Sequence, residues 1–211
     1  MVKFNCSTRH LMSNKILILF AHPLLEKSRI HKALIRRARN VMGVHVHDLY
    51  EHYPIFNIDI HFEQKQLLKY DLIIWQHPVY WYSIPPLLKQ WIDMVLEFGW
   101  AYGKDGNKLQ DKYLMQVFSS GGPMHVYTET GRNKRPLREY MYCHEQTASL
   151  CKMVYLPPFV IHGTHLLRDE QIEQEAINYE RILHQLVNSD IDMEELKSML
   201  YINDWEPKIK K

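Results

Sequence analysis

Three adjacent aromatic residues, Tyr80, Trp81 and Tyr82, follow the apolar run at 71–76. A short apolar run of this kind is typical of a buried parallel strand. Three consecutive side chains cannot all point into one core, so we expect at least one of them to face a crevice or a partner chain. Ligands of open α/β sheets bind outside the carboxyl ends of the strands. The aromatic residues therefore predict flat walls for a planar ligand, and the alternative is that they are ordinary core residues.

A second candidate segment follows the apolar run at 15–22. Ser28 and Arg29 begin a helical pattern there, and a helix N-terminus offers free backbone N–H groups and a positive dipole end that suit a phosphate. The alternative is that Ser28 only caps the helix. His22 and His31 flank this helix start. His22 could contact a ligand or simply hydrogen-bond the loop, and His31 could face either the ligand or solvent. The segment contains neither a dinucleotide fingerprint nor a Walker pattern.

The third candidate segment is Ser-Ser-Gly-Gly at 119–122, at the end of the apolar run 112–120. Glycine lets the backbone approach a ligand closely, although alone the segment would be read as an ordinary turn. The three segments follow the first, third and fourth strands of the predicted sheet. The crevice of such a sheet lies where the strand order reverses, so together they favour one shared site.

Strand-like runs alternate with helical patterns five times along the chain, which predicts a parallel sheet covered on both faces. We expect a flavodoxin-like three-layer α/β/α fold with a five-stranded parallel sheet in the order 2-1-3-4-5. Gly43 is predicted to end the first helix as its C′ residue. The domain is predicted to span 15–188, between an N-terminal extension at 1–14, expected to be disordered, and a C-terminal tail at 189–211. The predicted strands are 15–22, 44–50, 71–76, 112–120 and 154–163, and the predicted helices are 28–42, 61–69, 85–98, 136–152 and 169–188.

Composition and charge narrow the possible functions of these 211 residues. A net charge of +2 gives no electrostatic case for nucleic-acid binding. The three cysteines show no metal-binding spacing, which fits a reducing compartment. No apolar run approaches the length of a membrane span. His45 and His47 share a strand face without a third ligand, so a solvated edge is expected rather than a metal site, and His162 and His165 are given no role.

With these residues in view, the chain resembles the flavodoxin-like NAD(P)H:quinone oxidoreductases of the DT-diaphorase superfamily. Within that group it is most similar to the ancillary subunits of glutathione-regulated Kef potassium-efflux systems. The block at 47–64 is distinctive of the Kef branch, and the block at 77–103 is shared with the wider superfamily. The resemblance extends from Lys15 to about Val187, and the matching stretches are ILILFAHP (16–23), HDLYEHYPIFNIDIHFEQ (47–64), 71–103 and YLPPFVIH (155–162).

The resemblance implies a homodimeric flavoprotein with FMN rather than FAD, and NAD(P)H as co-substrate. It implies two-electron hydride transfer from NAD(P)H through the flavin to quinone-like acceptors. An azo- or nitroreductase would use the same flavin. A further alternative is a regulatory subunit of a Kef-type antiporter with little turnover. The implied location is the cytoplasm, with peripheral binding at the inner face of the cell membrane for an antiporter subunit.

The resemblance also assigns roles to residues of the three segments. The phosphate and ribityl chain would be met by His22, Ser28, Arg29, Ile30 and His31. The isoalloxazine would be framed by Val79, Tyr80, Trp81 and Tyr82, and its other polar edge contacted by Ser119, Ser120, Gly121 and Gly122. In the larger relatives a tyrosine and a histidine after the glycine loop relay charge. His125 and Tyr127 are the nearby candidates here, although their spacing departs from the family pattern.

Overall fold

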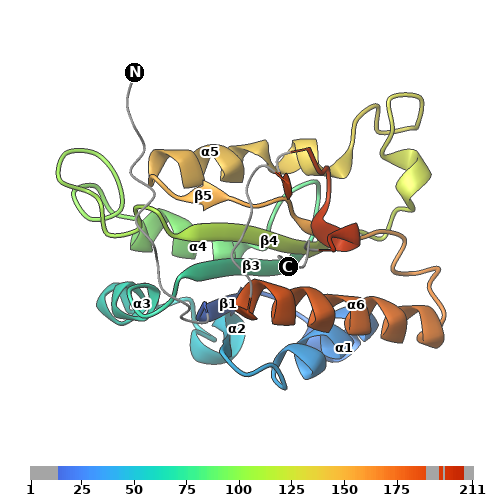
Figure 1. Ribbon diagram of the computed structural model, residues 1–211, viewed down its shortest axis with the longest axis horizontal. Coiled ribbons are helices and arrows are strands. Elements are labelled where there is room, and N and C mark those ends of the chain that lie inside the picture. Colours follow the sequence, from blue (N-terminus) through green and yellow to red (C-terminus); the bar gives the residue numbers. More distant parts are fainter. Residues whose placement is uncertain (1–13, 189–194, 197, 207–211) are drawn as a thin grey trace, which may run out of the picture.

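The computed structural model describes residues 14–188, 195–196 and 198–206 (Figure 1). Apart from Asn14, the predicted N-terminal extension lies outside the described residues, as does part of the predicted tail. All strands run parallel, in the order β2-β1-β3-β4-β5 with β6 also paired to β4, so the predicted order is confirmed. The strands are β1 (Ile16–Phe20), β2 (Val44–Asp48), β3 (Leu72–Pro78), β4 (Tyr113–Ser119), β5 (Val154–Tyr155) and β6 (Phe159–Ile161).

Two short strands share the fifth position of the sheet, where the sequence predicted one strand within residues 154–163. Pro157 and Pro158 lie between them, and proline has no N–H to donate to a ladder. β5 pairs with the start of β4, and β6 pairs with its end. The interruption leaves the direction unchanged, so the carboxyl end of β6 reaches the same edge of the sheet as that of β4.

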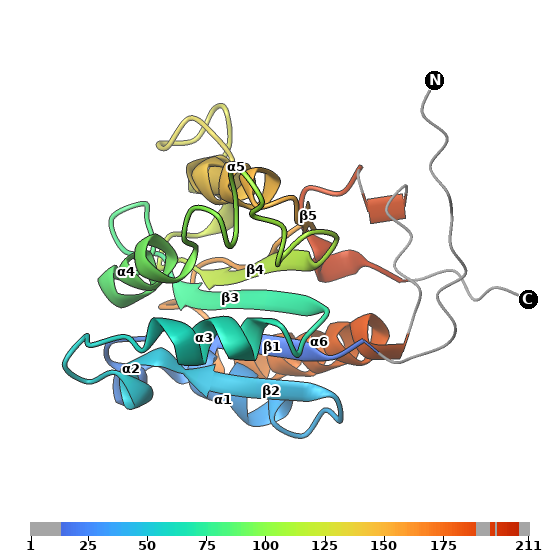
Figure 2. The same cartoon turned by 90° about the vertical axis from the view of Figure 1, so that its left-hand side faces the viewer.

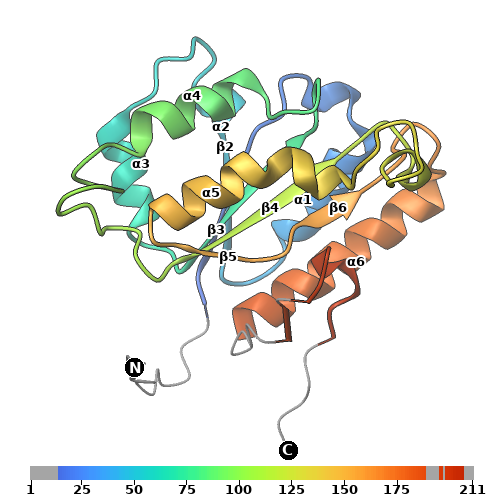
Figure 3. The ribbon, with the colours of Figure 1, turned by 90° about the horizontal axis from the view of Figure 1, so that it is seen from above.

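Helices cover both faces of the sheet and confirm the three-layer prediction. α1 (Arg29–Ala38) and α6 (Asp169–Asn188) pack into the core on one face of the sheet, and α5 (Tyr142–Leu150) packs into the core on the other (Figures 2 and 3). α3 (Ile60–Leu67) and α4 (Pro86–Val95) share the second side (Figure 3). Successive residues of β1 enter opposite cores, as strand geometry requires. None of the described helices has the length and apolar character needed to cross a membrane.

Several element boundaries differ from the prediction for local reasons. The first helix ends at Ala38 rather than near residue 42, and Gly43 (φ +90°) instead turns the chain into β2, where its carbonyl accepts the Ile16 N–H. β2 ends at Asp48 because its carboxylate caps the N–H groups of Tyr50 and Glu51 and so starts α2 (Leu49–His52). The predicted helix at 136–152 begins as a 3₁₀ turn, η3 (Leu137–Met141), and continues as α5.

The two histidines of β2 have different environments. His45 is exposed, but His47 is buried, and its Nε2 lies 2.7 Å from Glu63 Oε1. Glu63 is itself fully buried and also accepts hydrogen bonds from the Tyr53 hydroxyl (2.6 Å) and the Trp91 indole N–H (2.8 Å). The expected solvated edge is therefore wrong for His47, because α3 brings a carboxylate against it. Within the described ranges, no three His, Cys, Asp or Glu side chains are grouped to hold a metal ion.

Candidate functional site

The aromatic turn, residues 80–83, is a tight two-residue hairpin turn that follows β3. Tyr80 and Ser83 exchange both backbone hydrogen bonds at 3.0 Å. Trp81 and Tyr82 have φ values of 48° and 60°, which is the left-handed geometry of a type I′ turn. Such a turn favours Asn-Gly, and the left-handed conformation costs a residue with a Cβ roughly 1–2 kcal/mol. Two bulky residues kept in this conformation at the carboxyl end of a strand indicate a functional constraint.

This turn presents its aromatic side chains outside the core. Trp81 is 94% exposed, and Tyr80 and Tyr82 are 40% and 45% exposed, so none of the three is a core residue. The preceding residue, Val79, is half-buried and donates its N–H to the Ser119 carbonyl at 2.8 Å. That bond fixes the start of the aromatic turn to the end of β4, where the glycine loop begins.

The start of α1 supplies backbone donors rather than a side-chain cation. Ser28 is the N-cap, and its hydroxyl accepts the His31 N–H at 3.1 Å. The Arg29 guanidinium is held by Asp169 (2.6 Å) and by the Leu167 carbonyl (3.0 Å), so it links α1 to the start of α6. The side chain of Ile30 is buried in the core. What remains available to an anion here is the free N–H groups and the positive end of the helix dipole.

His22 and His31 are neutral residues that join this helix start to the aromatic turn. Burial lowers the pKa of His22, and it lowers the pKa of the fully buried His31 well below the ordinary value. The Leu24 N–H donates to His22 Nδ1 at 3.1 Å, so the neutral ring carries its proton on Nε2. The His22 ring lies 5.2 Å from that of His31 and 6.3 Å from that of Tyr80.

A buried hydrogen-bond chain orients the hydroxyl of Ser119. The Tyr179 hydroxyl donates to Gln76 Oε1 (3.0 Å), and Gln76 Nε2 lies 3.5 Å from His31 Nδ1. His31 Nε2 is 2.9 Å from Ser119 Oγ. Because Nδ1 accepts, the neutral imidazole donates from Nε2, which leaves the Ser119 hydroxyl hydrogen free to point toward a ligand.

Two aromatic side chains pack closely against the glycines of the glycine loop, residues 119–122. The Ser120 N–H donates to the Ile161 carbonyl, and its hydroxyl donates to the Gly122 carbonyl, both at 2.9 Å. A Cβ at Gly121 would lie 2.7 Å from the ring of His165, and one at Gly122 would lie 3.1 Å from the ring of Tyr127. Both approaches are too close for a larger residue without a shift of the ring.

The lobe, residues 123–135, separates the two candidate relay residues. It follows β4 and is drawn in yellow in Figure 1. Tyr127 is half-buried against the glycine loop, and burial raises its pKa, partly offset by a hydrogen bond with Ser120. His125 lies exposed on a 3₁₀ turn, η2 (Met124–Val126). The histidine whose ring lies beside Tyr127, at 5.6 Å, is His162.

His162 was not selected from the sequence. It directly follows β6, its Nδ1 lies 3.5 Å from Ser120 Oγ, and its buried Nε2 has no hydrogen-bond partner among the described residues. Burial lowers its pKa to about 4. The signal that could have found it is its position after the fifth strand, which is the same rule that selected the other three segments.

The structure thus brings together the start of α1, the aromatic turn, the glycine loop, Tyr127 and His162. The comparisons with known proteins place the chain in a family. Residues 14–183 match the family model described as the flavodoxin-like fold. General stress protein 14 of Treponema denticola, solved in complex with FMN, is 38% identical over 82% of this chain and 99% of that chain, with a TM-score of 0.78.

Two further solved structures are similar at this level. One, described as a thermophilic tryptophan halogenase of Streptomycin violaceusniger, is 34% identical over 83% of this chain and 99% of that chain, with a TM-score of 0.78. An NADPH-quinone reductase of P. pentosaceus is 29% identical over 84% and 99%, with a TM-score of 0.74. These names differ in activity, so the likeness establishes the family rather than one reaction. The chain belongs to the family of proteins with the flavodoxin-like fold.

Proposed function

We propose that the protein is an FMN-dependent NAD(P)H oxidoreductase that reduces quinone-like acceptors by two-electron hydride transfer. The observation that carries this proposal is the convergence of a helix start, a strained aromatic turn and a glycine loop at the carboxyl ends of β1, β3 and β4. Two relatives support it: one, 38% identical, was solved with FMN, and the other, 29% identical, is named as an NADPH-quinone reductase.

The residues at this edge of the sheet fit the parts of FMN. The free N–H groups at the start of α1 suit its phosphate. They are the donors that remain there, because the neighbouring His22 and His31 are neutral and Arg29 is already paired. The aromatic turn offers faces for the flat ring. The Ser119 hydroxyl hydrogen and the backbone of the glycine loop suit polar atoms at the edge of that ring.

When bound, FMN would supply the hydride chemistry, and the chain would bind, orient and hold protons around it. Tyr127 and His162 lie side by side at the glycine loop. The pKa of Tyr127 is raised and that of His162 is lowered to about 4, both by burial, so at neutral pH the phenol is protonated and the imidazole is neutral. We therefore propose Tyr127 as the residue that donates a hydrogen bond where negative charge develops, with His162, in place of His125, as the ring that lies beside it.

One titration tests the proposed function. The full-length apo protein is titrated with FMN, followed by its fluorescence, and the loaded protein is then mixed anaerobically with NADH or NADPH and with menadione. We expect stoichiometric binding and nucleotide oxidation that depends on the acceptor. Trp81→Ala should weaken FMN binding, whereas Phe98→Ala, an exposed aromatic residue beyond the far end of α4, should not. Wild-type protein that stays colourless after FMN loading would refute the proposal.

An acceptor panel separates the related reductase activities. Quinone, azo and nitro compounds would use the same flavin, so relative kcat/KM values decide among them. We propose quinones as the preferred class, on the support of the resemblance and of the named quinone reductase. A higher kcat/KM for an azo dye than for menadione would move the assignment to an azoreductase.

We also propose that the protein is a homodimer whose second subunit covers the aromatic turn. Trp81, 94% exposed in the single chain, is an aromatic surface of the type that interfaces bury. Light scattering should give twice the mass of one chain, and Trp81→Glu should shift it toward the monomer. A monomeric wild type with full reductase activity would contradict the proposed dimer.

The Kef-type regulatory role rests on the resemblance of residues 47–64. It predicts that the protein binds the cytoplasmic side of a potassium-efflux antiporter. Potassium efflux should then be measured in cells that carry the antiporter with wild-type protein, with Trp81→Ala, or with neither. Efflux that is the same in all three would exclude the regulatory role and leave the reductase activity untouched.

A further inference from the structure

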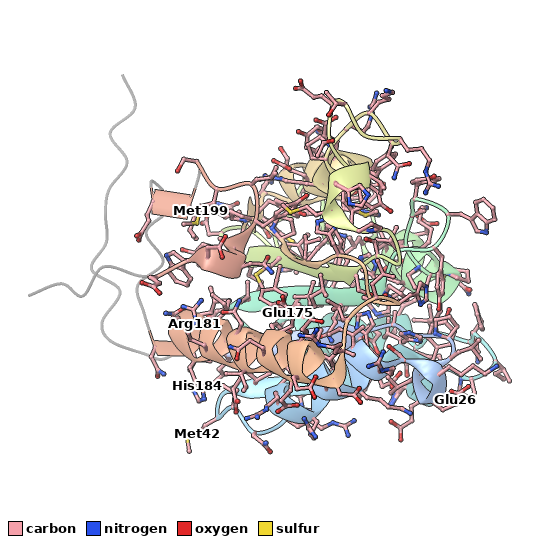
Figure 4. The ribbon with its side chains drawn as sticks, turned by 90° about the vertical axis from the view of Figure 1, so that its right-hand side faces the viewer. Glu26, Met42, Glu175, Arg181, His184 and Met199 are labelled. Carbon is pink, nitrogen blue, oxygen red and sulfur yellow. The ribbon has the colours of Figure 1, made fainter. Side chains whose placement is uncertain are left out.

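The C-terminal segment, residues 198–206, is an integral part of the fold although the matched family model ends at residue 183. Ile202 and Trp205 are fully buried in the core that contains α1 and α6. Arg181 of α6 donates to the Trp205 carbonyl (2.7 Å) and to the Asn203 carbonyl (3.2 Å). Figure 4 shows Arg181 on the side of α6 that faces the segment carrying Met199.

The segment is also fixed to the edge of the sheet. The Asn203 side chain accepts the Val160 N–H and donates to the Val160 carbonyl, both at 2.9 Å. The Ile202 N–H donates to the Pro158 carbonyl at 3.0 Å. These bonds cover the edge of β6, which would otherwise present unpaired groups. They also place the segment next to His162, the residue that follows β6 in the chain.

Tyr201 connects the segment to His162. Its ring lies 5.7 Å from the His162 ring at 65°, an edge-to-face arrangement. On its other side, the Tyr201 hydroxyl lies against the backbone N–H groups of Leu137 and Arg138 at the start of η3. The Arg138 guanidinium in turn donates to the carbonyls of Met199 (3.0 Å) and Leu200 (3.3 Å). Tyr201 is therefore held from both sides, and its position fixes one side of the His162 ring.

A row of aromatic rings continues from Tyr201 to the aromatic turn. His162 is followed by Tyr127 at 5.6 Å, Tyr140 at a further 6.4 Å and Tyr82 at a further 5.0 Å. Tyr82 belongs to the aromatic turn, and Tyr127 closes over the glycine loop. Consecutive contacts thus run from the C-terminal segment into both parts of the candidate flavin site.

We propose that Tyr201 of the C-terminal segment is a component of the reductase site, a positioning residue that holds His162 against Ser120 and Tyr127. Through that ring Tyr201 shapes the wall that meets the flat electron acceptor, and so it sets acceptor affinity rather than flavin affinity. The inference rests on the proposed reductase function. It adds to the proposed site a residue that lies beyond the family match. This residue acts through another side chain rather than on the reacting atoms.

The test compares full-length, FMN-loaded Tyr201→Ala, Tyr201→Phe and the neighbouring control Leu200→Ala. Loss of one aromatic pair should raise the KM for menadione about fivefold in Tyr201→Ala, with kcat and the FMN dissociation constant within about twofold of wild type. Tyr201→Phe keeps the ring on His162 and should keep the wild-type KM, as should Leu200→Ala. In the apo protein, the ring NMR signals of His162 should move in Tyr201→Ala and stay in place in Tyr201→Phe.

If Tyr201→Ala does not fold, a second variant, Tyr201→Leu, makes the same test. Tyr201→Leu fills most of the volume without an aromatic ring, and the same rise in KM is expected. An unchanged menadione KM in the folded non-aromatic variant overturns the inference, whatever the His162 signals do. An equal rise in Leu200→Ala or Tyr201→Phe also overturns it. Wild-type protein that binds no FMN would instead refute the proposed function, so the two failures are distinguishable.

Discussion

At the scale of single residues, the clearest sign of function is backbone strain in the aromatic turn. Trp81 and Tyr82 occupy left-handed positions that Asn and Gly would fill at lower cost. We predict that the double substitution Trp81→Asn with Tyr82→Gly raises the free energy of unfolding of the apo protein by about 1–2 kcal/mol. The same variant should bind FMN at least about tenfold more weakly, because the flat walls are gone. Urea denaturation and FMN titration measure the two effects.

The opposite signs of these two effects make the experiment decisive. A double variant that is less stable than wild type would show that the side chains, rather than the strain, dominate the energetics of the turn. Unchanged FMN affinity would remove the aromatic turn from the proposed flavin site. Phe98→Ala is the control for loss of an exposed aromatic side chain outside the turn.

Glu63 stabilises the fold through the hydrogen bonds that it accepts in the core. Burial acts to raise its pKa, but hydrogen bonds from His47, Tyr53 and Trp91 prevail and lower it. We predict that Glu63→Leu, which leaves three buried donors unpaired, lowers the free energy of unfolding by about 3–5 kcal/mol. Glu63→Gln should cost much less, because its carbonyl can accept from Trp91 while its amide donates to the other two partners. Equal losses in urea denaturation of the two variants would contradict this account.

At the scale of elements, the sequence predicted the sheet and its helices because their periodic apolar patterns report burial directly. The sequence patterns did not predict the ends of elements that are set by a single side chain. Asp48 turns β2 into α2 by capping, and two prolines divide the fifth strand. The three candidate segments were found because each follows a recognisable strand. His162 was missed because it was judged by its sequence neighbours, whereas its partners Tyr127 and Tyr201 lie far away in the chain.

A buried network between β3 and β4 gives the fold a pH dependence. His77 Nδ1 donates to the Pro78 carbonyl (3.0 Å), which leaves Nε2 to accept from Gln116 at 3.2 Å. Gln116 also lies 3.4 Å from His144 Nδ1, and the Tyr155 hydroxyl donates to its carbonyl at 2.8 Å. Burial lowers the pKa of His77 to about 3 and that of His144 to about 4, so the folded protein keeps both rings neutral.

This network predicts loss of stability in mild acid. The unfolded chain binds protons on these histidines below pH 6.5, whereas the folded chain resists them until about pH 4 for His144 and about pH 3 for His77. Stability is therefore fully present above pH 6.5 and falls as the pH drops toward these values, by up to about 1.4 kcal/mol per pH unit for each histidine. Urea denaturation at pH 7, 5.5 and 4.5 measures the slope. His77→Gln should flatten it, and a slope equal to that of wild type would contradict the assignment.

At the scale of the whole molecule, the candidate site is assembled from segments spread from residue 22 to residue 201. The parallel sheet explains why loops after β1, β3, β4 and β6 meet at one edge. It does not explain the C-terminal segment, whose place depends on side-chain contacts. No periodic pattern in the sequence indicates that a single asparagine continues the sheet, so the sequence does not predict where the tail lies.

Asn203 pairs with the edge of β6 through its side chain, in the place where a neighbouring strand would otherwise pair. Its amide pairs with both backbone groups of Val160, and its own carbonyl accepts from Asn178 at 3.0 Å and from Arg181. We predict that Asn203→Ala lowers the free energy of unfolding by about 2–3 kcal/mol, since two backbone groups at the sheet edge lose their partner. Asp204→Ala, the exposed neighbour, should change it by less than about 0.5 kcal/mol. Urea denaturation measures both variants.

The hydrogen exchange of the Val160 amide separates a local from a global effect of Asn203→Ala. If the asparagine covers the edge of β6, the Val160 amide should exchange much faster in Asn203→Ala, while the amides of β1, in the interior of the sheet, keep their protection. The opened edge should also make the variant more prone to self-association at high concentration, because unpaired strand edges recruit other chains. Full protection of the Val160 amide in Asn203→Ala would show that the segment stays docked without this pair. The anchoring of Tyr201 would then rest on the burial of Ile202 and Trp205 and on the hydrogen bonds that Arg138 and Arg181 donate to the segment.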